Sequence, residues 1–456
     1  MAESTLSVTL HLPQGINYEC DGCGKCCSGW AVPMTEEDYK RISPIDWGEL
    51  LPKVKGRKLF RPLRPHEKKD TPYSNAIIEY DDGFCPFLVN NLCFIHGQRG
   101  SKFKPAMCQQ FPYSFNETPS GIYATVSFVS MAVCHNTGKS LIDQRDYMEE
   151  KLVDFQRLYP NAHPNWSKLE ITTGKPITWD QYLELEKQII SHLQERSKPL
   201  EQRFLEASRF LANRAASIPS AAQPGSASSG SGGGAATTGT TESGGGSTGT
   251  GGGSGAGSST ETSATTGATT TSGGNSGKRL KSMDNHLLHA LHSTYFPTRI
   301  LSPSENEFQV SRILGQILLR GFGAPLRISV PGQSYTLTEL EDIEWPKDEP
   351  EVEDLLYRYF FSRVFGKLYF AAGYGQLSVL AGFNHLALVY ALLKLQCKAL
   401  AKSRGAKRVN YLDLIAAVRQ LEKRLGEASL SGYAAALFEL LMFSPQRLQR
   451  VLAITA

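Results

Sequence analysis

The chain has 456 residues, 41% of them hydrophobic, which allows about two or three domains with cores of ordinary size. Its formal net charge is only +4, too small to require a nucleic-acid partner, and we expect none. Residues 1–15 lack a basic stretch followed by an apolar core, so we expect no secretion signal and a cytoplasmic location.

The first predicted domain, residues 1–142, holds eight of the nine cysteines. Four lie in the run from Cys20 to Cys27, where Gly22 and Gly24 let the backbone curl so that the sulfurs converge. A disulfide framework is the alternative, but it is typical of small secreted domains. In a reducing compartment clustered thiols more often bind metal. The predicted metal ligands are Cys20, Cys23, Cys26, Cys27, Cys85, Cys93, Cys108 and Cys134.

The spacing of the cysteines is strong evidence for a metal site but weak evidence for which metal they bind. Two-residue gaps suit both a tetrahedral zinc site and one corner of an iron–sulfur cluster. The adjacent side chains of Cys26 and Cys27 diverge, which is awkward for a single zinc ion, and Cys85-Pro86 is similar to the Cys-Pro of bacterial cluster motifs. We favour an iron–sulfur cluster of the 4Fe–4S kind and keep zinc as the alternative. His96 and His135, each close to a cysteine in sequence, are further candidate ligands.

The rest of the first domain predicts short strands and loops. Residues 76–80 and 122–133 are dense in β-branched and aromatic side chains, which favours strands. The loop 53–69 is strongly basic. We interpret it as solvated surface, with a docking patch for an acidic partner as the alternative.

A helical region is predicted over residues 143–215. Thr178 and Gln181 form a capping box for a helix that runs towards Glu195, and Pro199 precedes a second helix that extends to Asn213. Residues 216–277 are almost entirely Gly, Ser, Thr and Ala. Such a segment cannot bury enough apolar surface to order itself, so we expect a disordered linker with an end-to-end distance of roughly 45 Å.

A helical C-terminal domain, residues 278–456, is predicted to pack on residues 143–215. Its helices begin at Pro350, near Leu377 and after Asn410, and a last hairpin is broken near Pro445. We expect no membrane association, because the most apolar stretch, residues 377–395, contains polar side chains and fits a buried helix better. His286, His289 and His292 are predicted to form a solvated helix face, and Cys397 is predicted to be buried. An aromatic run in the same domain is predicted to be largely buried: Tyr357, Tyr359, Phe360, Phe361, Phe365, Tyr369 and Phe370.

These elements predict an α+β chain. It consists of a small cysteine-rich, metal-bound N-terminal domain and a mainly α-helical domain that the Gly/Ser/Thr linker interrupts. The sequence also shows no glycine-rich turn in the strand–helix context that common nucleotide-binding folds use, because Gly373-Tyr-Gly375 follows a predicted helix.

The order of the cysteines has a known counterpart. The run that ends Cys26-Cys27-Ser-Gly-Trp30 is followed by Cys85-Pro-Phe-Leu88, Asn91-Leu-Cys93, Cys108-Gln-Gln-Phe-Pro112 and Cys134. This order resembles the CxxCxxCC cysteine-cluster family, a zinc- or iron-chelating domain. The Cys-Cys-x-Gly-Trp ending and the helical region behind it are most similar to the flagellin lysine N-methylases. Departures are the tighter spacing of the first cysteines and Phe111-Pro112-Tyr113, where the methylases tend to have Phe-Pro-Arg.

The resemblance implies a metalloprotein that transfers a methyl group from S-adenosylmethionine to a lysine of a flagellin-like protein substrate. The sequence identifies neither the catalytic residues nor those that bind the methyl donor. The alternative is a non-catalytic protein that chelates metal or transfers electrons through an iron–sulfur centre. If the chain is a methylase, we expect a cleft between the cysteine domain and the helical domain, lined with aromatic and acidic residues. If it is a carrier of metal or electrons, we expect an exposed cluster and no such cleft.

Overall fold

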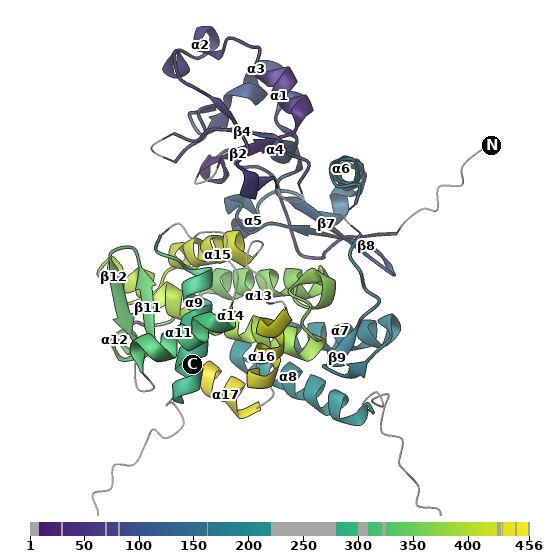
Figure 1. The fold of residues 1–456 in the computed structure, drawn as a ribbon, viewed down its shortest axis with the longest axis vertical. Helices are drawn as coiled ribbons and strands as arrows, with labels where there is room; N and C mark the ends of the chain where they lie inside the picture. The colour runs from purple at the N-terminus through teal and green to yellow at the C-terminus, as the bar shows by residue number, and fades with distance from the viewer. Residues whose placement is uncertain are drawn as a thin grey trace, which may run out of the picture. The chain divides into compact units, whose positions relative to one another are not determined.

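The structure is a computed structural model (Figure 1). It describes residues 9–28, 31–68, 71–80, 83–161, 163–219, 280–299, 309–321, 325–425, 430, 432–442 and 445–454. The compact part of the chain combines residues up to 220 with residues from 277 onwards. The predicted linker, residues 216–277, therefore lies outside the described residues except for its first four, of which two still belong to helix α8.

Three small sheets organise the cysteine-rich region. One sheet has the order β1-β8-β7, with β1 parallel to β8 and β8 antiparallel to β7. A second has the order β2-β4-β3, and the third is the hairpin β5–β6. The strands are β1 (Leu10–His11), β2 (Val32–Met34), β3 (Phe60–Pro62), β4 (Asn75–Ile77), β5 (Leu88–Val89), β6 (Leu92–Cys93), β7 (Tyr113–Thr118) and β8 (Gly121–Val126).

Both predicted strands of this region are present but shorter than predicted. The strand expected over residues 76–80 is β4, which ends at Ile77. The strand expected over residues 122–133 is wrong in its second half, because β8 ends at Val126 and Met131–His135 form the short helix α5. The side chain of Ser130 accepts a hydrogen bond from the amide of Val133, which caps that helix and overrides the β propensity of its residues.

Short helices connect these sheets. They are α1 (Glu36–Ile42), α2 (Trp47–Leu50), α3 (Phe94–Arg99), α4 (Ala106–Gln110) and α6 (Arg145–Leu158).

Helices dominate the remainder of the chain, as predicted. The Thr178–Gln181 capping box is present at the start of α7, Pro350 opens α13, Ser378 caps α14 and Asn410 accepts from the amide of Asp413 at the start of α15. The elements are β9 (Glu170–Thr172), β10 (Lys175–Pro176), α7 (Trp179–Gln194), α8 (Leu200–Ser217), α9 (Ser282–Tyr295), α11 (Val310–Arg320), β11 (Arg327–Val330), β12 (Gln333–Thr336), α12 (Leu337–Glu341), α13 (Pro350–Phe365), α14 (Val379–Ser403), α15 (Tyr411–Leu425), α16 (Gly432–Met442) and α17 (Pro445–Ala453).

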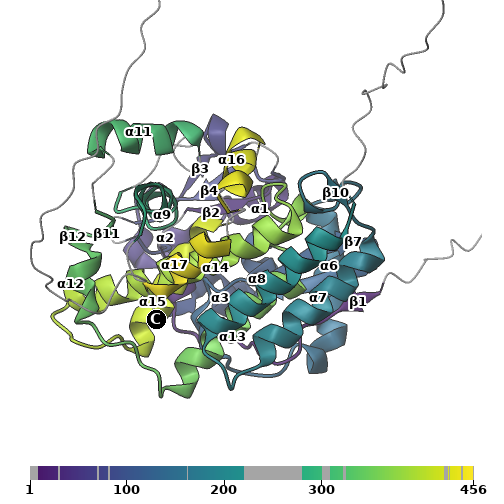
Figure 2. The same cartoon turned by 90° about the horizontal axis from the view of Figure 1, so that it is seen from below.

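Helix α14 is the centre of the helical region. It packs against α8, α15 and α17, and α7 and α8 run side by side next to it (Figure 2). It is the one described helix long and apolar enough to cross a membrane, and 94% of that apolar window is buried inside the protein. The buried helix predicted over this stretch is confirmed, as is the burial of Cys397.

The prediction of a solvated histidine face on α9 is wrong. His286 and His292 are buried and His289 is half-buried, because α9 packs against α11, α14, α15 and β11. His292 Nε2 lies 2.9 Å from Gln396 Oε1, and burial lowers the pKa of His292 to about 4.

The burial predicted for the aromatic run of α13 and the turn after it is confirmed for most of its members. Only Tyr357 and Phe365 are partly exposed. These rings therefore form core packing rather than an open binding surface.

One large and two smaller hydrophobic cores fill the described part of the chain. The large core runs from the β7–β8 sheet, with Phe115 and Val126, into the helical region, and it includes Cys134. A smaller core lies around Trp47 and Phe87, and Cys85, Cys93 and Cys108 pack against it. These three cysteines therefore share the edge of a core that the helical region does not reach.

Candidate metal centre

The loop that carries the first cysteines folds over the β5–β6 hairpin. Gly22 and Gly24 both have positive φ, +65° and +68°. A Cβ on Gly22 would lie 2.9 Å from Leu92 Cδ2, and one on Gly24 would lie 3.2 Å from the Cα of Asn91. Both glycines are therefore needed for their backbone conformation and for close packing on the hairpin.

Backbone hydrogen bonds bring the second group of cysteines to this loop. The amide of Cys85 donates to the carbonyl of Cys27 at 2.9 Å, beside a bridge between Ser28 and Phe84. In the hairpin, Leu88 pairs with Cys93, and the amide of Leu88 donates to the carbonyl of Cys85 at 3.0 Å. Cys27, Cys85 and Cys93 are thus held on three adjoining backbone segments.

Four thiols converge in this region, and we call Cys27, Cys85, Cys93 and Cys108 the four-thiol group. Burial, followed by the neighbouring thiols of Cys93 and Cys26, raises the pKa of Cys27 to about 11. Burial also raises the pKa of Cys85 to about 12, and Cys27 and Cys93 add to it. The pKa of Cys108 is raised by burial, with Cys85, Cys27 and Cys93 as further causes. Thiolates at these positions would repel one another without a cation between them.

The remaining four predicted ligands are arranged around Cys26. Its thiol adds to the raised pKa of Cys23, about 11, and to that of Cys134, about 12, both of which are caused mainly by burial. Burial is the main cause of the raised pKa of Tyr18, and the thiols of Cys20 and Cys26 both add to it. Cys20 is exposed, whereas Cys134 is fully buried and donates from Sγ to the carbonyl of Phe128 at 3.2 Å. Cys26 therefore has Cys23, Cys27 and Cys134 as thiol neighbours, whereas Cys27 also has Cys93 beside it.

The thiols are spread more widely than a closed zinc site requires. With Zn–S bonds of about 2.3 Å, a tetrahedral ion sets its sulfur ligands about 3.8 Å apart. No three thiols in the described part of the chain have sulfurs that all lie within 4.8 Å of one another.

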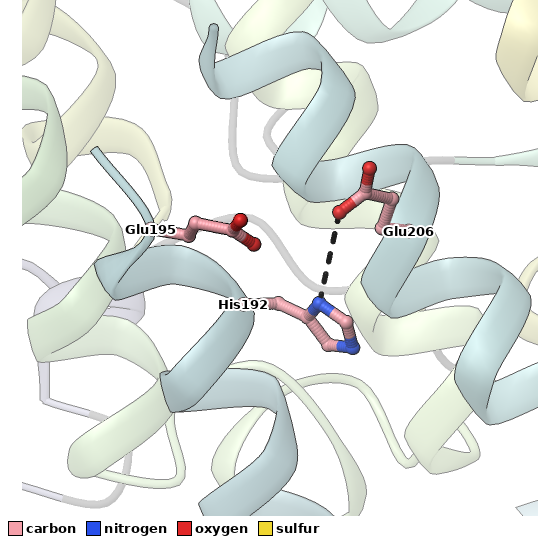
Figure 3. Close-up of side chains that lie close together, drawn as sticks. All are labelled: His192, Glu195 and Glu206. Carbon is pink, nitrogen blue, oxygen red and sulfur yellow. Dashed lines mark ion pairs between the residues drawn. The ribbon is translucent and has the colours of Figure 1, made fainter. Parts of the chain in front are cut away.

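Among the described residues, one cluster of possible metal ligands is compact enough, but a lysine already pairs with both of its carboxylates. His192 and Glu195 at the end of α7 approach Glu206 of α8, with His192 Nδ1 3.9 Å from the carboxylate of Glu206 (Figure 3). The ammonium of Lys198 lies 3.0 Å from Glu195 and 2.8 Å from Glu206. This cluster is a partly exposed ion-pair network, in which the lysine takes the place that a metal would need.

Two arginines join the cysteine segments to the helical region, and neither was predicted. Arg419 of α15 donates to the carbonyls of Val129 at 2.8 Å and Lys25 at 2.9 Å. Arg358 of α13 donates to the carbonyls of Val133 and Cys134, each at 2.7 Å. No sequence pattern marks these arginines, because their partners are main-chain atoms between 224 and 394 positions away.

The two candidate histidines lie at the surface. His96 and His135 are both exposed, and the ring of His135 packs against that of Tyr411 with centroids 5.6 Å apart. Tyr411 itself donates to the carbonyl of Cys134 at 2.9 Å. His135 therefore supports the wall around Cys134.

Comparison with known proteins supports a chelating role for this region. A family described as "CxxCxxCC: Putative zinc- or iron-chelating domain" matches residues 19–132. A CxxCxxCC domain is thus found in the first third of the chain. It contains seven of the eight predicted ligands, with Cys134 two positions beyond its end. The match supports a metal cofactor at these cysteines.

Similarity beyond this domain is limited. An uncharacterized protein of Methanocaldococcus jannaschii is 27% identical over 210 residues, which cover 44% of this chain and 67% of the relative. No solved structure matches the chain. The resemblance to flagellin lysine N-methylases has no support from these comparisons.

Proposed function

We propose that the chain is an iron–sulfur protein and that the four-thiol group, Cys27, Cys85, Cys93 and Cys108, is the principal ligand set. The observation that carries the proposal is the convergence of Cys85, Cys93 and Cys108 at the edge of one small core, with Cys27 joined to Cys85 by a backbone hydrogen bond. Because the segments are distant in sequence, the binding free energy of the metal would also stabilise the fold of this domain.

The donor set fits a soft, polynuclear centre. All four donors are thiols, which suit iron–sulfur clusters and zinc rather than hard cations. Cys85-Pro86, which is similar to the Cys-Pro of bacterial cluster motifs, favours a cluster over one tetrahedral ion. A bound iron–sulfur cluster would supply one-electron transfer. The group of Cys20, Cys23, Cys26 and Cys134 is the proposed second ligand set.

The close packing of β7 and α5 on α13 agrees with the non-catalytic alternative, a metal-chelating or electron-transfer protein. The amide side chain of Asn116 on β7 donates to the carbonyl of Gly366 at 2.8 Å, and the buried Lys367 reaches Glu186 of α7 at 3.0 Å. Arg358 fills the space beside Cys134 in the same way. Side chains thus fill the contact of β7 and α5 with α13, whereas a cavity of about 380 Å³ remains between α1, α4 and α6, with Glu37, Asp38 and Asp154 in its lining.

Protein-lysine N-methylation is the second candidate, with S-adenosylmethionine as donor and a flagellin-like protein as acceptor. The resemblance of the Cys-Cys-x-Gly-Trp segment supports it, and the contacts of the helices after the linker with α7 and α8 agree with it. Incubation of metal-replete protein with labelled S-adenosylmethionine and flagellin tests it. Transfer of label to flagellin lysines would support it, and absence of both donor binding and transfer would eliminate it.

The metal proposal is tested by purification of the full chain without oxygen. We expect a brown protein with broad visible absorption and equal amounts of iron and acid-labile sulfide. Colourless protein with stoichiometric zinc would contradict it.

A further inference from the structure

A second site lies in the helical region, away from the cysteines. A cavity of about 610 Å³ opens between the first turn of α8, residues 345–347 and helices α13, α14 and α17. This volume is within the range of small-molecule pockets, about 300–1,000 Å³. Its walls are mainly apolar and include the buried side chains of Leu200, Val352 and Leu356, together with the indole of Trp345. No described cysteine lines it.

A charged pair forms part of the lining of this otherwise apolar cavity. The side chain of Lys394 on α14 is only 4% exposed, and its ammonium pairs with the carboxylate of Glu201 on α8. The same ammonium lies 4.8 Å from the centre of the Trp345 ring. Burial, partly offset by Glu201, lowers the pKa of Lys394. The nearby ammonium of Lys347, which also lines the cavity, lowers it further.

One lysine of the lining has no ion-pair partner. Lys394 has Glu201 as its partner, whereas Lys347 forms no ion pair with any carboxylate of the described residues. The ammonium of Lys347 is therefore open to an anionic group. The other charged residues of the lining are paired: Arg203 with Glu353, Arg196 with Asp354, and Lys198 with Glu195 and Glu206.

The buried pair of Lys394 and Glu201 is not explained by a gain in the stability of the fold. A buried lysine–carboxylate pair is often no more stabilising than an apolar pair of similar volume, because both charges lose water. A cavity with apolar walls, a few convergent polar groups and a lysine of altered pKa is the usual form of a small-molecule site.

We propose that this cavity binds a small organic anion, with its carboxylate or phosphate group between Lys347 and Lys394 and its apolar body against Val352, Leu356 and Trp345. The unpaired ammonium of Lys347 accounts for the anionic group, and the volume and walls account for the apolar body. The proposal is independent of the metal centre and of methyl transfer.

The test is a titration of the full, metal-loaded chain with decanoate, 2-naphthoate, 2-naphthyl phosphate and the neutral decanol, followed by calorimetry and tryptophan fluorescence. We expect at least one anion to bind saturably and at least tenfold more tightly than decanol. The anion that binds most tightly shows whether the site prefers a carboxylate or a phosphate, and whether it prefers an alkyl chain or an aromatic ring. In W345F the fluorescence change on binding should disappear while calorimetric binding persists.

Charge-reversal variants locate the anionic group. Lys347 is exposed, so K347E should fold normally and weaken anion binding at least tenfold. K187E carries the same charge change on an exposed position of α7 that does not line the cavity, and should change affinity less than twofold. Equal effects of K347E and K187E, equal binding of decanol and the anions, or no saturable binding of any anion would each overturn the proposal.

Discussion

Gly24 illustrates how single positions shape the cysteine loop. Its φ of +68° lies in the left-handed region, and a Cβ would press on Asn91 and on Leu88 Cδ2, 3.1 Å away. The glycine directly precedes the 3-10 turn Lys25–Cys27 and contacts the hairpin that bears Cys93. It therefore serves both the conformation of the loop and its contact with the second group of cysteines.

We predict that G24A loses metal without unfolding the chain. The left-handed conformation costs an alanine about 1–2 kcal/mol, and the contact with Asn91 adds strain. Metal content after anaerobic purification should fall at least twofold. G56A is the matched control, since Gly56 has a φ of +74° but nothing within 4 Å of the added Cβ. Equal metal loss in both variants would show that packing on the hairpin is unimportant.

Arg358 is the residue-scale link between the helices and Cys134. We expect R358A to lower the free energy of unfolding by about 3 kcal/mol, because two buried carbonyls and Asp354 lose a charged donor. Urea denaturation of metal-loaded protein measures this. R196A removes an arginine that also pairs with Asp354 but is 44% exposed, and should cost less than about 1 kcal/mol. Similar losses in both variants would contradict the role given to the carbonyls.

At the scale of elements, β8, α7 and the turn after α13 meet at one buried lysine. Lys367 is fully buried, pairs with Glu186 of α7 and lies 3.1 Å from the centre of the Tyr123 ring on β8. Burial lowers the pKa of Lys367 to about 8 and raises that of Glu186, with the pairing opposing both shifts. The pair therefore fixes how the sheet meets the helices more than it adds stability.

A double-mutant comparison tests this interpretation. K367M alone should cost about 3–5 kcal/mol, because Glu186 stays buried without its cation. The double variant K367M/E186L should recover most of that loss, since an apolar pair avoids the desolvation of both charges. Thermal or urea unfolding supplies the two values. A double variant as unstable as K367M would mean that the ion pair itself is strongly stabilising.

At the scale of the whole molecule, the Gly/Ser/Thr-rich segment should be dispensable. Its composition offers no core and no ligand beyond hydroxyls and a few carboxylates. We expect replacement of residues 221–276 by a short Gly-Ser link to leave the helical circular dichroism, the melting temperature and the metal content within experimental error. Loss of either the fold or the metal would show that the segment has a structural role.

Much of the architecture follows from local sequence patterns. The capping residues Thr178 and Asn410 mark helix starts that the structure reproduces. Predictions failed where tertiary contacts decide the outcome, as for the buried His286 and His292. The cysteine-rich domain was recognisable from spacing, whereas the approach of Cys85 and Cys93 to Cys27 depends on a hairpin and on bridges that periodicity does not reveal.

The most direct test of the four-thiol group as the principal ligand set compares serine variants of single cysteines after anaerobic purification. C27S, C85S, C93S and C108S should each lose most of the iron and sulfide of the principal centre, because each removes one of its four ligands. C397S changes a cysteine that is buried in α14 and should keep the full amount. Full iron and sulfide in any of the four variants, or colourless wild-type protein with zinc, would contradict this assignment.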